Sequence, residues 1–99
     1  MAAYVLLIKW TDQGMRQIRD SPNRLDKAKA MLRDMGGQFT SFYMTMGEYD
    51  MVAIVEAPDD ISMTALGLSS GALGNVRTQT LRAFTQTDMK TIVGKMVKG

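Results

Sequence analysis

The stretch MGEYDMVAIVEAPDD, from Met46 to Asp60, holds the side chains best suited to chemistry. Glu56 interrupts an apolar run there, and a carboxylate in such a place must be solvated, paired with a cation or in contact with a ligand. Tyr49 and Asp50 are adjacent, so in a strand their side chains would point to opposite faces and could not share a proton. We therefore expect a structural role for the Tyr49-Asp50 pair and keep Glu56 as a hypothetical ligand contact.

Other side chains could complete a binding site around Glu56, although none can be assigned a catalytic role. Trp10 ends an apolar run, where an aromatic ring could line the mouth of a chamber or simply pack. Arg77 and Arg82 are candidate partners for Glu56, but alternation in a strand places them on opposite faces, and the sequence does not say which one points inward. The hypothetical ligand-binding set is Tyr43, Asp50, Glu56, Trp10, Arg77 and Arg82.

The composition excludes several kinds of chemistry. The 99 residues include no histidine and no cysteine, so the commonest general base and the thiolate and imidazole metal ligands are missing. The 10 methionines are interpreted as adaptable core packing rather than as thioether ligands. We expect no metal and no cofactor. The chain shows neither a membrane-spanning apolar run nor a secretory signal, so a cytoplasmic protein with no membrane partner is expected.

Positive charge gathers between Arg16 and Arg33, although the net charge of the chain is only +2. This segment contains no interleaved aromatic residues and no recognisable DNA-binding motif. We interpret it as a solvated helix face and do not expect nucleic-acid binding.

The order of apolar patterns predicts the fold. Tyr4–Trp10 and Met51–Ala57 are continuous apolar runs, typical of central strands, whereas 38–46 and 76–84 alternate as edge strands do. Helices are predicted between them, from Ser21-Pro22 to Gly36-Gly37 and from Pro58 to Gly74-Asn75. The sequence thus predicts one α+β domain over residues 1–99 with the ferredoxin-like order β-α-β-β-α-β, followed by a C-terminal helix.

The helical apolar residues recur at helical spacing and are expected to face the sheet. The C-terminal stretch from Asp88 to Lys98 has an apolar stripe of its own and should dock on protein rather than on membrane. The first helix is expected to bury Leu25, Ala28, Leu32 and Met35; the second, Ile61, Ala65, Leu68 and Ala72; the C-terminal stripe is Met89, Ile92, Val93, Met96 and Val97.

Both helices should cover the same face of the sheet, so the other face requires a partner. A second copy of the chain is the simplest cover, giving a homodimer or a larger even-numbered oligomer built as a dimeric α/β barrel. A two-residue turn at Gly47-Glu48 would fix which residues face that chamber, because the turn sets the parity of the hairpin. The helix side should carry Phe42, Met44, Met46, Tyr49, Met51, Ala53 and Val55, and the chamber side Phe39, Ser41, Tyr43, Thr45, Asp50, Val52, Ile54 and Glu56.

MGEYDMVAIVEAPDD together with LGNVRTQTLRAF resembles the GYD domain family, with the family tripeptide interrupted as Gly47-Glu48-Tyr49-Asp50. The similarity extends to WTDQG (10–14) and DSPNRLDKAK (20–29) and implies a dimeric α/β barrel, in a family whose function is not established. GEYDMVAIVEAPD with LGNVRTQTL is also similar, more loosely, to the effector-binding domain of leucine-responsive bacterial regulators. That likeness implies amino-acid binding between subunits. The DNA-binding helix-turn-helix of those regulators is missing here.

Two functions of different classes follow from the sequence. The favoured one is a small-molecule binding or sensing module that uses the chamber between two sheets. The alternative is a cofactor-independent enzyme of the dimeric-barrel kind, an isomerase or monooxygenase acting on a hydrophobic metabolite. The enzyme requires an acid and a base that converge in one cleft, and the sequence shows only isolated carboxylates and tyrosines. A structural oligomer without any ligand is a third possibility.

Overall fold

A computed structural model describes residues 1–98 and contains the predicted elements in the predicted order. Two short helical turns connect the first strand to the first long helix. The elements are β1 (Ala2–Trp10), α1 (Asp12–Arg16), the 3-10 turn η1 (Ile18–Asp20), α2 (Ser21–Asp34), β2 (Gln38–Met44), β3 (Met51–Ala57), α3 (Asp60–Ala72), β4 (Val76–Ala83) and α4 (Gln86–Gly94).

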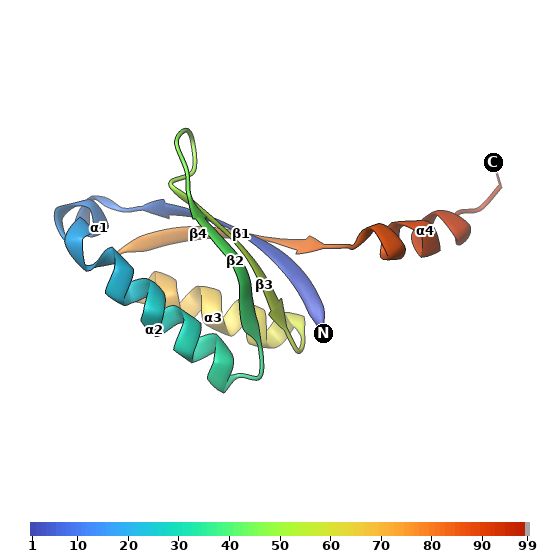
Figure 1. Cartoon of the computed structure of the whole chain (residues 1–99), viewed down its shortest axis with the longest axis horizontal. Coiled ribbons are helices and arrows are strands. Elements are labelled where there is room, and N and C mark those ends of the chain that lie inside the picture. The colour runs from blue at the N-terminus through green and yellow to red at the C-terminus, as the bar shows by residue number, and fades with distance from the viewer. Residues whose placement is uncertain (99) are drawn as a thin grey trace.

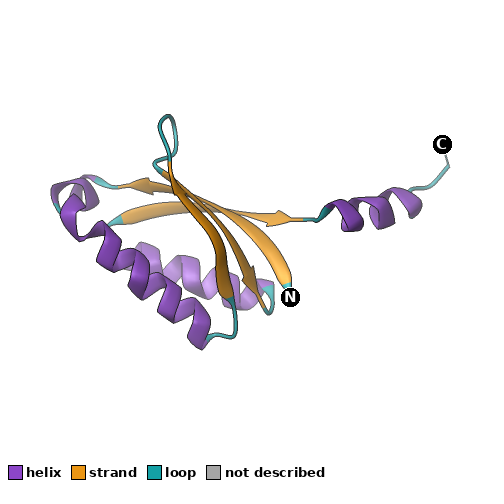
Figure 2. Cartoon of the chain, viewed as in Figure 1, coloured by secondary structure: helices purple, strands orange, loops and turns teal. Residues whose placement is uncertain are grey.

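The four strands form one antiparallel sheet in the order β2-β3-β1-β4. The continuously apolar strands β1 and β3 are central and the alternating strands β2 and β4 are at the edges, which confirms the prediction. Both long helices lie on the same face of the sheet, and no element of the described chain covers the other face (Figures 1 and 2). This is the ferredoxin-like α+β fold. We call the uncovered side the open face.

The core lies between the sheet and the two long helices. Along β3, Met51, Val55 and their alternate neighbours are buried, whereas Val52, Ile54 and Glu56 are half-exposed on the open face. The core is completed from α2 and α3, and its buried residues are Tyr4, Leu6, Ile8, Leu32, Met51, Ala53, Val55, Ala57, Met63 and Leu66.

The face prediction for Phe39 is wrong. Phe39 pairs with Val55 and packs against the core, on the helix side, because a bulge at Thr40 separates it from Ser41, which pairs with Ile54. An extra residue in one strand reverses the side to which all earlier residues point. Strict alternation extended back from the hairpin therefore assigns residues 41–44 correctly and fails before the bulge.

The hairpin between β2 and β3 is longer than predicted. Thr45 N–H donates to the Asp50 carbonyl at 2.8 Å, so Met46 to Tyr49 form a four-residue loop in place of the expected Gly47-Glu48 turn. The loop length is still even, and Tyr43 accordingly pairs with Val52. Met46 and Tyr49 are not in strands, however, and the prediction that they face the helices is wrong. Gly47 has a φ of 115°, a left-handed value that glycine adopts without strain.

The helices bury fewer of the predicted positions than expected. In α2 only Leu32 is fully buried, and Leu25, Ala28 and Met35 remain half-buried. The predicted stripe of α3 is wrong, because Met63 and Leu66 are the buried residues while Ile61 and Leu68 are exposed. Apolar residues lie on more than one side of α3, so helical spacing alone does not identify the side that meets the sheet.

The C-terminal helix α4 leaves the end of β4 and extends away from the rest of the chain (Figure 1). Thr85 and Asp88 form a capping box that begins the helix. None of its residues is buried, including the apolar stripe that contains Met89, Ile92 and Val93. Docking of this stripe therefore stays a prediction about an assembly. No helix among the described residues has the length and apolarity that a bilayer crossing requires.

Candidate functional site

The open face of the sheet is apolar at its centre. Leu7 lies between Val52 of β3 and Gln79 of β4, and Val5 lies in the same way between Ile54 and Leu81. These side chains alternate with the buried ones on the same strands, so they point away from the core. Hairpin parity assigned Val52 and Ile54 to this face, but β1 is apolar on both sides and shows no alternation, so the sequence did not place Val5 and Leu7.

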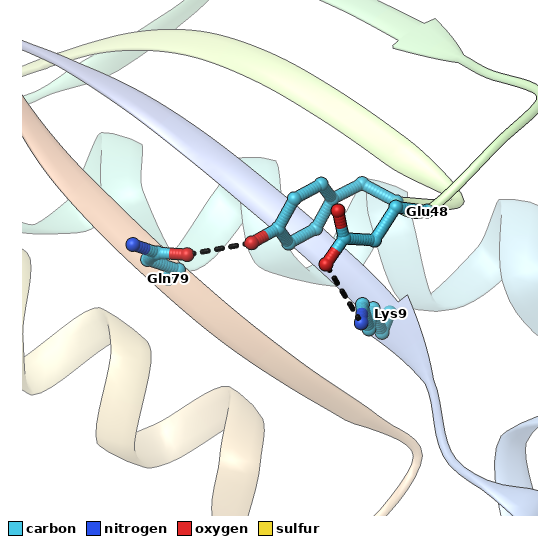
Figure 3. A network of polar contacts seen from close by, with 4 residues as sticks. Lys9, Glu48 and Gln79 are labelled. Carbon is cyan, nitrogen blue, oxygen red and sulfur yellow. Dashed lines mark hydrogen bonds and ion pairs between the residues drawn. The ribbon is translucent and has the colours of Figure 1, made fainter.

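The hairpin loop folds over one end of the open face. The Tyr49 hydroxyl donates to Gln79 Oε1 at 2.7 Å, so its side chain crosses β1 and reaches β4. Lys9 Nζ lies 5.1 Å from the centre of the Tyr49 ring and 3.8 Å from Glu48 Oε1. Figure 3 shows Lys9 and Gln79 on neighbouring strands beneath Glu48. Loop residues of the Gly-Glu-Tyr-Asp segment thus form a polar rim for the apolar face.

Asp50 joins the hairpin to the central strand through the backbone of β1. Its carboxylate accepts the Trp10 N–H at 2.9 Å, and its own N–H donates to the Ile8 carbonyl at 2.9 Å. The side chain therefore extends the pairing between β3 and β1 past the end of the ladder. This geometry fits the expected structural role of the Tyr49-Asp50 pair. The two side chains are engaged with different strands.

Glu56 lies at the opposite end of the open face from the loop. It stands in register with Gln38 and Ala3, and Gln38 Nε2 donates to Glu56 Oε1 at 3.3 Å. Within residues 1–98 the ion pair found joins Lys9 to Glu48, so neither Arg77 nor Arg82 pairs with Glu56. Glu56 is half-exposed on the open face, and Gln38 is the hydrogen-bond partner of its carboxylate found among the described residues.

Tyr43 shares the open face with Glu56 but does not adjoin it. Tyr43 is opposite Val52, four residues before Glu56 on β3, which corresponds to roughly 13 Å along a strand. Its side chain is 64% exposed. A single small ligand could contact both groups only if it extended over Ile54.

Two of the other hypothesised residues belong to the helix side. Trp10 packs against the core, and its indole N–H donates to Ser21 Oγ at 3.1 Å. Arg82 stands opposite Tyr4, with its guanidinium carbon 5.5 Å from the centre of that ring. Neither side chain therefore meets Glu56 or Tyr43 within the chain. Arg77 pairs with Lys9 in register, and its side chain also lines a groove between α3 and β4.

Sequence reasoning missed a polar cluster around Tyr4. Tyr4 is buried, and its hydroxyl donates a hydrogen bond to Asp60 Oδ1, at the start of α3. Burial, with the hydrogen bond to Asp60 as the next cause, raises the pKa of Tyr4 to about 12. Arg82 covers the ring and also lies 4.9 Å from the centre of the Phe84 ring. The apolar run around Tyr4 gave no signal of this pairing.

Comparison with known proteins places this sheet in a described family. The GYD domain model matches residues 4–93, which include the hairpin loop, most of β1 and the whole of β2, β3 and β4. The chain belongs to the GYD domain family. A Thermus thermophilus protein named glutamine synthetase and cystathionine beta-lyase binding protein is 31% identical over 90 residues, which are 90% of this chain and 95% of that protein.

Solved structures share the fold. A feast or famine regulatory protein of Mycobacterium tuberculosis, complexed with L-methionine, aligns with a TM-score of 0.65 at 21% identity. That alignment covers 87% of this GYD domain and 52% of the regulator, so the chain spans about half the regulator's length. A Thermus thermophilus protein of solved structure aligns with a TM-score of 0.54 at 25% identity, covering 86% of this chain and 95% of that one. The looser resemblance to leucine-responsive regulators is thus confirmed at the level of fold.

Proposed function

We propose that this GYD domain is a homo-oligomeric small-molecule binding module whose ligand lies between two open faces. The observation that carries the proposal is the exposure of an apolar sheet centre, Val5, Leu7, Val52 and Ile54, with no covering element in the described chain. Soluble proteins seldom leave such a face unpaired. A second copy related by a two-fold axis would present the same surface and cover it.

The polar groups at the two ends of this face would set ligand preference. Glu56 lies at one end, and Lys9, Tyr49 and Gln79 form the rim at the other. A mostly apolar chamber with a carboxylate and an ammonium group suits a zwitterion with an apolar side chain, such as an amino acid. The regulator complexed with L-methionine supports this ligand class, because it shares the fold.

Oligomerisation is tested by placing a charge at the centre of the open face. Light scattering at micromolar concentration should show an even-numbered oligomer for the natural protein and a monomer for Ile54→Lys, because a buried unpaired charge opposes assembly. Ala30→Lys is a matched control, since Ala30 is an exposed residue of α2, on the other side of the sheet from the open face (Figure 1). A natural protein that remains monomeric would contradict the proposal.

Ligand binding is tested separately, with a panel of amino acids that includes L-methionine, by calorimetry and native mass spectrometry. Glu56→Gln keeps the size of the side chain and removes its charge, so the oligomer should persist while affinity falls by roughly 10-fold, the value of one charged hydrogen bond. Equal affinities of Glu56→Gln and the natural protein would remove Glu56 from the site. An oligomer that binds no member of the panel would contradict the amino-acid class.

The alternative enzyme gains less support from the geometry. Catalysis without a cofactor requires an acid and a base that meet at one substrate. Tyr43 and Glu56 share a face but are separated along β3, and the Asp50 carboxylate is engaged with the backbone of β1. Binding to a partner enzyme is a second candidate function, favoured by the uncovered apolar stripe of α4 and by the name of the Thermus thermophilus relative.

A further inference from the structure

An apolar cleft lies on the other side of the sheet, within the helix layer. It has a volume of about 410 Å³, which is within the range of small-molecule sites. Its floor is the buried side of the sheet at Leu6, Ile8 and Met51. Its walls come from α2 and α3, the two long helices beneath the sheet in Figure 2. The cleft is therefore separated from the open face by the sheet itself.

The cleft exists because the inner side of α2 does not close on the sheet. Leu25, Ala28 and Met31 line it, and each is only half-buried, although Leu25 and Ala28 were expected to be core residues. On the opposite wall, Leu66 is buried and Leu73 is exposed. An apolar ligand that removed these walls from water would be favoured by the hydrophobic effect.

Positive charge lines the mouth of the cleft. Arg24 and Lys27 of α2 contribute two cations there, against one carboxylate from Asp20. Arg24 is held in place by hydrogen bonds to the carbonyls of Gln17, at 3.0 Å, and Gly14, at 3.4 Å. Lys27 is exposed and takes part in no ion pair within residues 1–98. Two cations of the basic segment between Arg16 and Arg33 thus line the cleft.

We propose that the cleft between α2 and α3 binds an apolar molecule with one anionic head group, such as a medium-chain carboxylate. The apolar part of the ligand would lie on Leu6, Ile8 and Met51, and its head group would meet Lys27 at the mouth of the cleft. Charge also argues against the α4 helix of a second copy as the occupant. That helix and its extension carry Lys90, Lys95 and Lys98 against Asp88, which is the same sign as the mouth.

Calorimetry with sodium decanoate, below its critical micelle concentration, tests the proposal on the full chain. The expected result is saturable binding of one decanoate per chain. Lys27→Glu should weaken this binding by roughly 5-fold, through loss of attraction and added repulsion, while Lys29→Glu should change it little. Lys29 is a matched control because it lies in the same helix, carries the same charge and does not line the cleft.

Two further measurements locate the ligand. Decanol has the same alkyl chain as decanoate but no charge, so it should bind more weakly. Its affinity should be the same for Lys27→Glu and Lys29→Glu. Ala28→Trp fills the cleft and should abolish decanoate binding, provided that circular dichroism shows the native fold. Glu56→Gln should leave decanoate binding unchanged, which distinguishes this site from the open-face chamber.

Several results would overturn the proposal. One is the absence of saturable decanoate binding, and another is an equal loss in Lys27→Glu and Lys29→Glu, which would indicate general attraction to a basic surface. Unchanged binding by folded Ala28→Trp would place the ligand elsewhere. Binding that appears only in Ile92→Glu, which disrupts the stripe of α4, would mean that a helix from a second copy fills the cleft.

Discussion

At the scale of single residues, Tyr49 and Asp50 are adjacent in the sequence but make different contacts. Tyr49 spans the open face to reach Gln79, while Asp50 completes the hydrogen bonding of β1 at Trp10. The loop lacks the strand geometry from which alternation was argued, so Tyr49 could turn to the open face. The Tyr49 side chain thereby connects the loop to β1, through Lys9, and to β4, through Gln79.

Removing the Tyr49 hydroxyl should weaken this connection. Tyr49→Phe is expected to lower the free energy of unfolding by about 0.5 kcal/mol, the low end for a neutral hydrogen bond, because Gln79 is exposed. Urea denaturation measures the change. Tyr43→Phe provides the control, since Tyr43 is exposed on the same face and should be neutral. Equal stabilities of the two variants would show that the bond to Gln79 contributes nothing.

Tyr4 predicts a pH dependence of stability. Its pKa rises on folding from 10.0 to about 12, so the protonated phenol is the form favoured in the folded protein. That stability is fully present below about pH 10 and is lost as pH rises toward about 12. In urea denaturation, the stability advantage of the natural protein over Tyr4→Phe should therefore shrink across this range. A constant advantage across this range would contradict the assignment.

At the scale of elements, close approaches of the backbone decide which glycines are essential. A Cβ at Gly14 of α1 would lie 2.0 Å from the carbonyl oxygen of Asn75, which also accepts the Thr11 N–H at 3.0 Å. In the interior of α3, a Cβ at Gly67 would meet Thr78 Oγ1 at 3.8 Å, an ordinary contact. Gly14 allows α1 to approach the backbone of Asn75 closely, whereas Gly67 only lowers the helix propensity of α3.

Alanine at these two glycines should have opposite effects. Gly14→Ala is expected to lower stability by about 2 kcal/mol, because the backbone of Asn75 must move. Gly67→Ala should raise stability by up to about 1 kcal/mol, the helix propensity difference, which corresponds to a melting temperature several degrees higher. Thermal unfolding followed by circular dichroism checks both. A destabilised Gly67→Ala variant would mean that α3 packs more tightly against β4 than the distances indicate.

At the scale of the whole molecule, the centre of the open face and the stripe of α4 are both apolar and uncovered within residues 1–98. Phe84 and Thr85 alone separate β4 from α4, and the helix points away from the sheet of its own chain (Figure 1). A second copy of the chain that covered the open face would place its own surface near α4. We therefore predict that α4 packs within the assembly.

Substitution in the stripe tests that packing. Ile92→Glu should lower the melting temperature by several degrees, the effect of losing about 1 kcal/mol or more in a domain of this size. Lys90→Glu in the same helix is a control for the added negative charge. Light scattering on both variants would show whether the proposed oligomer forms. An unchanged melting temperature for Ile92→Glu would indicate that the stripe serves a different partner.

The sequence by itself determined the order of elements, the central place of β1 and β3 and the side to which Glu56 points. These features follow from local patterns, namely apolar period, helix-ending glycines and an even loop. Only the tertiary structure decided the side of Phe39, the reach of Tyr49 and the burial of Met63 and Leu66 in place of Ile61 and Leu68. The physical reason is that a bulge, a loop and the rotation of a helix are set by packing against distant residues, and a local period cannot report them.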